Sequence, residues 1–329
     1  MQAEADWQPT ASLDALKLRA TVLASLRGFF AARNVLEVDT PALSVAGTPD
    51  PALHSFQTRW HGPGTLNGTS FYLHTSPEFP MKRLLAAGAG SIYQICKVFR
   101  DGESGRHHNP EFTLLEWYRT GFDYFDLMDE VEVLLREVLE GLVPVASVDH
   151  WTYRDLFVET AGIDPFTVTV AGLGSQLQAR GISPPAGLAA DDHDGWLDMV
   201  LTHVVEPAMP AGLVFVRDYP ASQAALARLR PGTPPVAARF EVYLNGIELA
   251  NGFHELTDAD EQRQRFAQEN ERRQQQGDDT IRTDEHLLAA LEAGVPDCAG
   301  VALGIDRLLM IAGEYGSLDD VIAFPLERA

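Results

Sequence analysis

The segment FRDGESGRHHNPEFTLLEWY, residues 99–118, decides the fold to which the rest of the chain must conform. The apolar run IYQICKVF leads into it, and its own second half, FTLLEWY, is again of strand type. Two β-type runs joined by an arginine- and glycine-rich connection predict an antiparallel hairpin with a long, charged loop. Arg100 and Arg106 lie near the base and the tip of this loop, and their guanidinium forks suit phosphate. The segment predicts an anion site, although a solvated loop has the same composition.

The sequence on either side of this hairpin predicts helices that flank a mainly antiparallel sheet. Ser12 caps a predicted helix that ends near Asn34, and Ser76-Pro77 starts another with Glu78 in its first turn. Further elements are expected as strands at 35–43, 71–75 and 213–220 and as helices at 123–141, 258–276 and 284–293. The pattern indicates an α+β fold with an antiparallel sheet flanked by helices.

Composition narrows the class of protein. The chain has 329 residues, of which 45% are hydrophobic and 22% charged, and its net charge of -22 argues against extensive nucleic-acid binding. Cys96 and Cys298 lack metal or redox spacing, which predicts buried free thiols. No signal peptide or membrane-length apolar run is present, so we expect a cytoplasmic protein that does not bind membranes. One catalytic domain is expected over residues 12–329, after a loose N-terminus at 1–11 and with a variable insertion at about 142–213.

A second hairpin is predicted where Asn245-Gly246 separates two apolar runs. A two-residue turn there pairs Tyr243 with Glu248, and continued pairing sets Glu241 opposite Ala250. The two glutamates then share one face, roughly 7 Å apart at their Cβ atoms.

Two carboxylates so close repel each other unless a cation lies between them, and Mg²⁺ bound to nucleotide phosphates is a natural candidate. A pair of solvated acids on an exposed sheet face is an equally good interpretation of this hairpin alone. Strict alternation places Glu255 on the opposite face, unless Asn251-Gly252 marks a bulge or a strand end.

The run AGVALGIDRLLMIAG, residues 299–313, adds a third charged element. It predicts a glycine-rich strand followed by an apolar helix, with Arg307 near the junction. Together with Arg100 and the two glutamates, this arginine predicts a clamp for ATP with Mg²⁺. The chain has no Walker-type or Rossmann-type phosphate loop, so ATP would have to bind in another way.

Three segments, in order, resemble the signature motifs of class II aminoacyl-tRNA synthetases. LEVDTPAL with Pro41 resembles motif 1, the segment at residues 99–118 resembles motif 2, and GVALGIDRLLM resembles motif 3. NPEFT and GIELANGFHEL strongly resemble the lysine enzymes of this class. The resemblance covers residues 12–329 and implies the class II fold, ATP as a substrate, Mg²⁺ as a cofactor and a homodimer.

Lysine-type synthetases carry an N-terminal domain that reads the anticodon, and here motif 1 begins too early to leave room for one. The chain therefore resembles the elongation factor P lysyltransferase family. That resemblance implies activation of (R)-β-lysine, or lysine, as an adenylate, and its transfer to a lysine side chain of translation elongation factor P. The alternative is a minimal lysyl-tRNA synthetase-like enzyme that charges tRNA, but the acidic net charge makes stable tRNA binding unexpected.

Two departures from the lysyl-tRNA synthetases fall in the expected amino-acid pocket. Ser76 stands where those enzymes usually have Ala, and Ala302 stands where they usually have Gly. Both changes add atoms to the pocket floor, which should disfavour an α-amino group and tolerate an amine moved by one carbon. A third departure is in motif 2, where Gly102 takes the place of a usual Glu and Glu103 follows.

The resemblance also assigns roles to single residues. Arg100 is expected at the α-phosphate and the amino-acid carboxylate, and Arg307 at the γ-phosphate; these two are the expected catalytic residues. Glu241 and Glu248 are the expected Mg²⁺ ligands. The expected ATP contacts are Arg100, Asp101, Gly102, His108, Asn109, Glu248, Leu249, Gly304 and Arg307.

Two cationic groups on the substrate require several acids nearby. Glu78 and Glu116 are expected to bind the backbone-side amine, and Tyr118 with Glu255 the distal ammonium. The expected substrate contacts are Ser76, Pro77, Glu78, Glu116, Tyr118, Phe253, Glu255 and Ala302. A catalytically inactive paralogue would not be expected to retain these charged residues. An amide-forming metabolic enzyme, as in the asparagine synthetase relatives of this fold, is disfavoured by the pair that suits a cationic amino acid.

Overall fold

The computed structural model describes residues 7–185 and 187–329, so residues 1–6 of the predicted loose N-terminus lie outside the described part. The chain divides into two compact units. The first comprises Met1–Asp123, Asp129–Pro144 and Thr257–Ala329, and the second comprises Tyr124–Met128 and Val145–Leu256. The expectation of a single catalytic domain is not tested by this division and stays a prediction.

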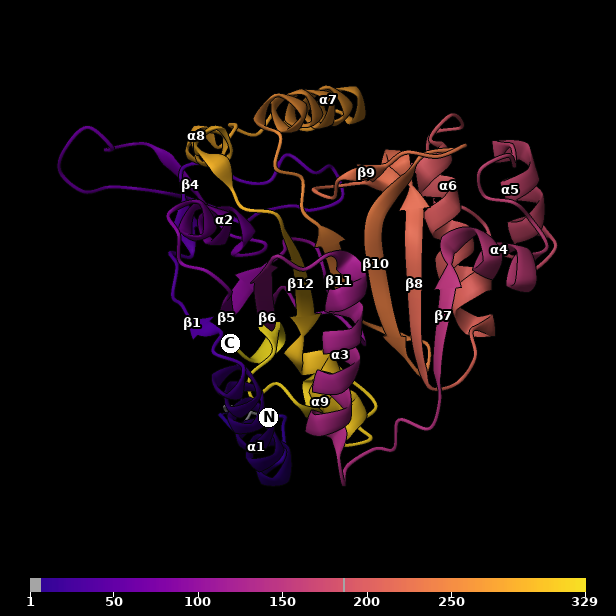
Figure 1. Cartoon of the computed structure of the whole chain (residues 1–329), viewed down its shortest axis with the longest axis horizontal. Helices are drawn as coiled ribbons and strands as arrows, with labels where there is room; N and C mark the ends of the chain where they lie inside the picture. The colour runs from indigo at the N-terminus through magenta and orange to yellow at the C-terminus, as the bar shows by residue number, and fades with distance from the viewer. Residues whose placement is uncertain (1–6, 186) are drawn as a thin grey trace, which may run out of the picture. The chain divides into compact units, whose positions relative to one another are not determined.

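The sheet of the first unit is built on the predicted hairpin (Figure 1). Its strands follow the order β1 (Leu36–Glu37), β5 (Ile92–Phe99), β6 (Glu111–Thr120) and β12 (Cys298–Gly304). β5–β6 and β6–β12 are antiparallel, which confirms the hairpin and the antiparallel character of the sheet, while the short edge strand β1 runs parallel to β5. The strand expected at 35–43 is shorter than predicted, because pairing stops well before Pro41.

One face of this sheet is covered by helix α1 (Leu13–Ala32), which begins at the predicted cap, where Ser12 Oγ accepts from the Ala15 amide at 3.1 Å. Phe30 of α1 stacks on Tyr93 of β5 at 4.3 Å between centroids and meets Trp117 of β6 edge-on at 5.4 Å. These side chains are almost fully buried, so the apolar stripe of α1 and the odd-numbered side of the hairpin form one core.

The remaining elements of the first unit pack around that sheet. A small sheet has the order β2 (Leu43–Ser44), β4 (Ser70–Leu73) and β3 (Gln57–Arg59). The helices are α2 (Glu78–Ala86), α7 (Ala259–Gln276), α8 (Glu285–Gly294) and α9 (Ile305–Ala312), with short 3₁₀ turns η4 (Leu318–Asp320) and η5 (Leu326–Arg328). Helix α3 (Tyr124–Leu139) begins in the second unit and continues in the first.

The second unit contains the second predicted hairpin. The strand order is β11 (Ile247–His254), β10 (Val236–Leu244), β8 (Leu213–Pro220) and β7 (Val148–Thr152), with β9 (Leu229–Arg230) beside β10. The helices are α4 (Tyr153–Ala161), α5 (Val170–Gln178) and α6 (His193–Val200), followed by the short turns η1 (Leu201–Val205), η2 (Glu206–Ala208) and η3 (Ala221–Gln223). Buried side chains of these helices and of β8 and β10 form one cluster, so residues 142–213, whose assignment as a variable insertion stays a prediction, supply much of this core.

The turn of the second hairpin is as predicted, but its register is not. Asn245 and Gly246 have φ values of 52° and 77°, and Tyr243 pairs with Glu248. The next pairs are Val242 with Ala250 and Glu241 with Asn251. The prediction of Glu241 opposite Ala250 is therefore wrong by one residue, because Leu249 is an extra residue that forms a β-bulge.

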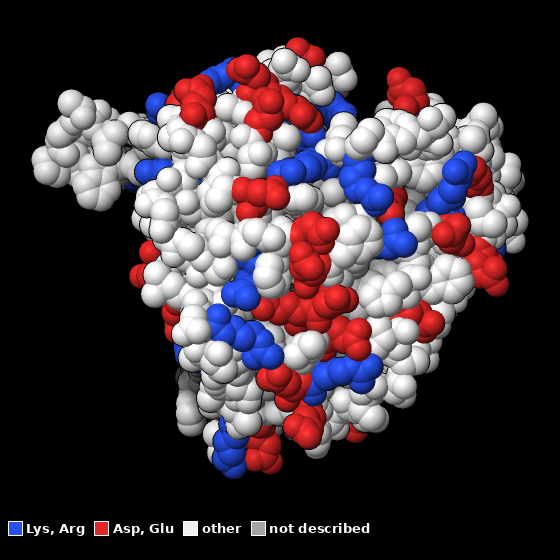
Figure 2. All heavy atoms as spheres, in the orientation of Figure 1, with Lys and Arg blue, Asp and Glu red and all other residues white. Residues whose placement is uncertain are grey.

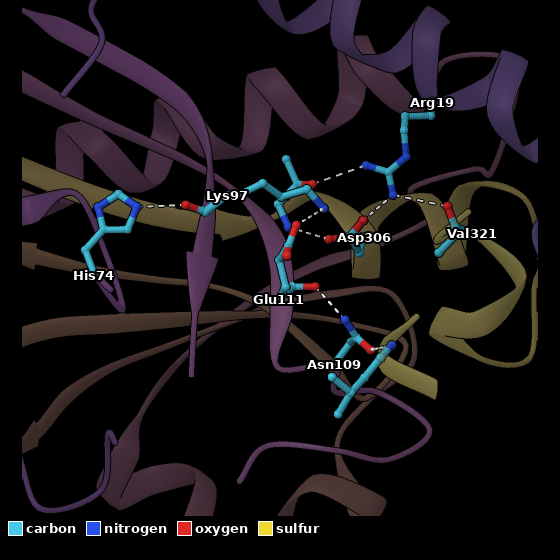
Figure 3. Close-up of polar contacts among 9 residues, drawn as sticks. Arg19, His74, Lys97, Asn109, Glu111, Asp306 and Val321 are labelled. Atoms are coloured by element: carbon cyan, nitrogen blue, oxygen red, sulfur yellow. Dashed lines mark hydrogen bonds and ion pairs between the residues drawn. The ribbon is translucent and has the colours of Figure 1, made fainter. Parts of the chain in front are cut away.

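A buried ion pair joins three segments of the first unit (Figure 3). Asp306, at the start of α9, is 1% exposed and accepts from the Thr113 amide of β6 at 2.6 Å. Its other carboxylate oxygen takes the guanidinium of Arg19 from α1. Arg19 also donates to the Val321 carbonyl at 3.1 Å, so α1, β6, α9 and the C-terminal segment meet at one charged centre.

The two cysteines are free, as predicted, and Cys298 is buried, but the prediction that Cys96 is also buried is wrong, because its side chain is partly exposed. Burial raises the pKa of the Cys96 thiol to about 12, and the neighbouring Glu116 carboxylate adds to that effect. A helix both long and apolar enough to cross a bilayer is not found in residues 7–185 and 187–329.

Replacing Arg19 with Met should destabilise the first unit, because it leaves the buried Asp306 carboxylate without its counter-charge. We expect a loss of about 3 kcal/mol in the free energy of unfolding, measured by urea denaturation with tryptophan fluorescence. The matched control is Arg27→Met on the same helix, which removes a solvent-exposed pair with Glu37 and should cost less than about 1 kcal/mol. Equal losses in the two variants would contradict the assignment.

Candidate active site

The register of the first sheet gathers polar side chains on the face opposite α1. Glu116 of β6 pairs with Gln94 of β5 on one side and with Ala302 of β12 on the other. Side chains of directly paired residues point to the same face, and Tyr118 follows Glu116 on that face at a spacing of two. The neighbouring Trp117 points the other way, into the core with Phe30. The strand therefore separates a hydrophobic face from a polar face.

Glu116 is a buried carboxylate at the centre of this polar face. It is 2% exposed, and each of its oxygens accepts a hydrogen bond: Oε1 from the Tyr118 hydroxyl at 2.6 Å and Oε2 from Ser76 Oγ at 2.7 Å. Burial is the main cause that raises its pKa to about 7, and the nearby charge of Glu78 is the second. A carboxylate poised between its two protonation states near neutral pH can accept an ammonium group by releasing its proton.

Helix α2 brings a second carboxylate and a cation to the same place. Pro77 precedes the helix, and Ser76 Oγ accepts from the Glu78 amide at 3.0 Å, so Ser76 bonds both to this helix start and to Glu116. Glu78 Oε1 lies 2.6 Å from the ammonium of Lys82, which is only 1% exposed. Sequence reasoning missed Lys82, although its spacing of four from Glu78 on a predicted helix could have indicated the pair.

Gln94 is a further polar residue that sequence reasoning missed. It is 1% exposed, and its Oε1 accepts from Thr40 Oγ1 at 2.9 Å. Its Nε2 meets no hydrogen-bond partner within the described residues. Burying an amide donor without an acceptor is costly, so this group is suited to a polar ligand at the polar face. A Gln inside an apolar strand was the available signal.

The first residues of the charged loop form a tight turn around Arg100. Its amide donates to the Pro110 carbonyl at 2.8 Å, and its guanidinium lies 5.0 Å from the Phe112 ring centroid. Gly102 has a φ of 82°, a conformation that favours glycine. The turn brings Glu103 within 3.7 Å of the Arg100 guanidinium, so the residue after the unusual glycine faces the expected phosphate ligand.

Two predicted nucleotide-binding residues hold the loop to other segments. Asn109 donates to the Glu111 carbonyl at 2.6 Å and accepts from the Leu326 amide at 3.1 Å (Figure 3). Arg307 donates to the His107 carbonyl at 3.2 Å and lies 2.8 Å from His108 Nε2. Asn109 thus ties the loop to the C-terminal segment, and its predicted contact with adenine stays a prediction.

Both loop histidines have lowered pKa values. For His108, burial is the larger cause and the Arg307 guanidinium adds to it. For His107, burial again comes first, followed by Arg106 and Arg307. The loop therefore carries its positive charge on arginines rather than on histidines at neutral pH.

The base of the loop is fixed by Asp101, whose backbone amide donates to the His54 carbonyl at 2.8 Å.

In the second unit, Glu241 is the centre of a buried polar cluster. It is 6% exposed and accepts from the hydroxyls of Tyr219 at 2.6 Å and Tyr243 at 2.5 Å. The Arg239 guanidinium pairs with its other oxygen and lies 4.4 Å from the Tyr219 ring centroid. These three donors were not predicted, although Arg239 and Tyr243 lie two residues on either side of Glu241 in a strand, which places them on its face.

The β-bulge decides which residues of β11 share that face. Leu249, the extra residue, is buried, and beyond it Asn251 pairs with Glu241 and Phe253 with Arg239. Glu248 and Phe253 consequently lie on one face although strict alternation would separate them. Continued alternation carries Glu255, which is 1% exposed, to the same side. If Glu255 joins the site, the sequence predicts a bulge or a strand end at Asn251-Gly252; the register has a bulge at Leu249 instead.

The structure thus assembles two polar groups of residues. In the first unit, Ser76, Glu78, Glu116 and Tyr118 meet around one buried carboxylate, with Ala302 beside it. Arg307 meets His108 and the motif 2 loop, and Gly304 caps the start of its helix. In the second unit, Glu241, Glu248 and Phe253 share a strand face. Among the described residues, no group of three or more His, Cys, Asp or Glu is arranged to hold a metal ion.

The fold and the three motif segments define the class: a family model of class II tRNA synthetases (D, K and N) matches residues 5–328, and the chain belongs to this family. Within it, the chain is similar over almost its whole length to proteins named elongation factor P–(R)-β-lysine ligase. It is 51% identical to the one from Vibrio cholerae serotype O1, covering 98% of this chain and 99% of the relative. Identity is 50% to those from Vibrio atlanticus (98% and 99%) and Pectobacterium atrosepticum (100% of both).

The raised pKa of Glu116 predicts a pH-dependent stability that Glu116→Gln should remove. The folded carboxyl keeps its proton up to about pH 7, whereas the unfolded one releases it near its ordinary pKa of 4.5. The folded state therefore binds more protons between these values, and the free energy of unfolding falls as pH rises through this window. From pH 4.5 to 8 the variant should gain about 3 kcal/mol relative to the unmodified protein.

Urea denaturation at a series of pH values measures this difference. The matched control is Glu137→Gln, which changes an exposed carboxylate of α3 and should leave the slope unchanged. A constant difference between Glu116→Gln and the unmodified protein across the pH range would contradict the raised pKa.

Proposed function

We propose that this protein is an ATP-dependent, AMP-forming ligase that activates (R)-β-lysine, or lysine, and transfers it to a lysine side chain of translation elongation factor P. The name of its relatives supports the reaction, and the single observation in this chain that carries it is the buried Glu116 with its partners. A carboxylate held away from water by two hydroxyl donors is a costly arrangement that an ammonium group of the substrate compensates.

The floor of this pocket supports a preference for an amine displaced by one carbon. Ser76 does more than fill space, because its hydroxyl donates to Glu116 at 2.7 Å and fixes the direction of that carboxylate. Ala302 is paired with Glu116 across β6 and β12, so its methyl group borders the same carboxylate. Both departures from the lysine-type pattern therefore adjoin the group that would receive the amine.

Activation needs positioning and charge stabilisation more than acid–base chemistry. The substrate carboxylate is already ionised and attacks the α-phosphorus of ATP, forming a C–O–P bond as pyrophosphate leaves. Arg100 stabilises the charge that develops on the α-phosphate. Its 3.7 Å separation from Glu103 is too long for a hydrogen bond, so a phosphate oxygen competes with that carboxylate. Arg307, held on the motif 2 loop, binds the γ-phosphate.

In the second step, the neutral ε-amine of elongation factor P attacks the carbonyl carbon of the adenylate. An amide bond forms, AMP departs as the leaving group, and the amine loses a proton. Tyr118 holds the distal ammonium of the activated amino acid, and the contacts expected from Glu255 and Phe253 stay predictions. Acidic residues are proposed at both amines of this substrate. A neutral amino acid would leave such residues without a cationic partner, so it would be a poor substitute.

Mg²⁺ is proposed at Glu241 and Glu248, where it would neutralise phosphate charge. Each glutamate carboxylate offers about four lone-pair positions, and the three donors on Glu241 leave one of them for a cation. Glu248 shares the face through its pairing with Tyr243. One or two carboxylates together with phosphate oxygens are the usual protein environment of Mg²⁺, so these residues fit it.

The same proposal includes a cytoplasmic homodimer. The short edge strands next to motif 1 expose Leu36 (55%) and Leu43 (48%), apolar side chains that a second copy would cover. Acidic and basic side chains are interspersed on the face shown in Figure 2. Together with the net charge of -22, this favours a folded protein acceptor over tRNA, whose backbone requires a basic surface.

ATP–pyrophosphate exchange over a panel of amino acids tests the activation step. We expect exchange with (R)-β-lysine to exceed exchange with α-lysine, and neutral amino acids to support none. Mass spectrometry of elongation factor P and of tRNA after incubation identifies the acceptor, and the expected product is elongation factor P that carries one β-lysyl group. Charged tRNA with unmodified elongation factor P would overturn the acceptor, and faster exchange with α-lysine would overturn the substrate preference.

Glu248→Gln tests the metal site. The amide cannot balance the cation's charge, so the Mg²⁺ concentration for half-maximal exchange should rise roughly tenfold or more. Glu159→Gln, on the exposed side of α4 in the same unit, serves as the control. An unchanged Mg²⁺ requirement in the Glu248 variant would exclude this residue as a ligand.

A further inference from the structure

Lys82 forms an ion pair with a residue of its own helix, but, unlike most ion pairs within a helix, this one is buried. Its side chain is 1% exposed, and its ammonium lies 2.6 Å from Glu78 Oε1, one helical turn before it. The same spacing occurs on α3, where Arg136 pairs with Glu132 at 2.8 Å, but there the side chains are 46% and 27% exposed. An exposed pair of this kind contributes little to stability, whereas a buried lysine needs a compensating charge to be tolerated.

The charges around Lys82 belong to the pocket of Glu116. Ser76 Oγ accepts from the backbone amide of Glu78 and donates to the Glu116 carboxylate, which holds the start of α2 beside Glu116. Glu78 and Lys82 act on the protonation of Glu116 in opposite directions: the carboxylate raises its pKa and the ammonium lowers it. Two carboxylates and one lysine leave a net charge of one negative unit, which a single ammonium group neutralises.

We propose that Lys82 is a positioning residue: it neutralises Glu78, so that Glu116 alone receives one ammonium group of the substrate. The inference rests on the proposed activation of a lysine-type amino acid. It changes the role of Glu78 from a direct ligand of the amine to the counter-charge of Lys82. Lys82 acts through Glu116 and Glu78, and it keeps the first of these available as a carboxylate when the substrate arrives.

Other titratable groups face this cluster and are the same in every variant of the test. On β5 and β6 they are Cys96 and Tyr118, whose neighbours include Glu116. Glu269 of α7 interacts electrostatically with Glu78. Burial, followed by the charge of Asp50, raises the pKa of Glu269 to about 8. Arg265 and Arg272 partly offset that effect on Glu269. Because these groups are shared by all variants, differences between variants report on Lys82, Glu78 and Glu116.

The test measures the KM for lysine and for (R)-β-lysine in ATP–pyrophosphate exchange between pH 6 and 9. In the unmodified protein, ionised Glu116 binds the ammonium, so KM should fall as pH rises and level off above a midpoint near 7. Lys82→Met should move this midpoint up by about one pH unit, because the charge that favours ionised Glu116 is gone. At pH 7, where half of Glu116 is already protonated in the unmodified protein, this corresponds to a roughly fivefold higher KM for the amino acid. The KM for ATP should change less than about twofold, as expected for a residue outside the phosphate site.

Three further variants test the direction in which the midpoint moves. Glu78→Gln should move the midpoint down by about one unit, because it removes the charge that opposes ionisation. The double variant, Glu78→Gln with Lys82→Met, removes both charges and should restore the midpoint near 7. Lys82→Arg keeps the charge and should keep the midpoint. Arg136→Met, the exposed pair of the same spacing, is the matched control and should leave both KM values unchanged.

Each outcome decides the proposal. A Lys82→Met midpoint equal to that of the unmodified protein, or a rise in KM that is the same at every pH, overturns it in favour of a purely structural ion pair. If Lys82→Met does not fold, a midpoint that fails to drop in Glu78→Gln, or to return in the double variant, overturns it equally. The pH dependence of unfolding, compared with Glu116→Gln in each background, reads the same midpoint without activity. Absence of exchange in the unmodified protein would therefore refute the proposed function while leaving this inference testable.

Discussion

The first unit depends on one buried carboxylate, Asp306, that receives donors from two other parts of the chain. It accepts the Thr113 amide from the central strand and the Arg19 guanidinium from the first helix. Neither partner is near it in sequence, so the contact can form only when the hairpin, α1 and α9 are all in place. A charge in the interior is tolerated only with its partners present, which makes this contact a test of the whole assembly. Arg307, the arginine of motif 3, is the next residue. The contacts of Asp306 therefore also fix the position of the Arg307 backbone, from which its side chain reaches the motif 2 loop.

The same physical rule shapes the two polar clusters. Glu116 has two hydroxyl donors and Glu241 has two tyrosines and an arginine, and each of these acids is almost fully buried. The two solutions differ in charge. Glu241 has a cation of its own in Arg239, whereas the Ser76 and Tyr118 hydroxyls that donate to Glu116 are neutral, and the nearby Lys82 pairs with Glu78. A buried carboxylate with neutral partners has a raised pKa and binds a cation favourably, which is the property that an amine-binding pocket requires.

Local signals were sufficient where local physics decides the outcome. The Ser12 cap, the Asn245-Gly246 turn and the strand at 213–220 were all predicted, because capping, positive φ and apolar runs are properties of a few adjacent residues. The class of fold followed from the order of the motifs. The partners of Glu116 and Glu241 could not be read in the same way, since a hydrogen bond between Ser76 and Glu116 depends on how α2 is packed over β6. Lys82 was within reach of local reasoning, but its burial was not.

The bulge at Leu249 shows most clearly why alternation alone fails at a site. A strand of strict period two can present residues of only one parity to one face. Glu248 has even parity and Phe253 odd, yet both lie on the face of Glu241, because one inserted residue inverts the parity between them. Sequence reasoning recognised that Glu255 required such an inversion but placed it at the glycine, where a bulge is easiest. The register instead inserts a buried leucine, so apolar packing compensates for the ladder hydrogen bonds that the bulge disrupts. Burial, which only the tertiary structure reveals, decides where the strand departs from regularity.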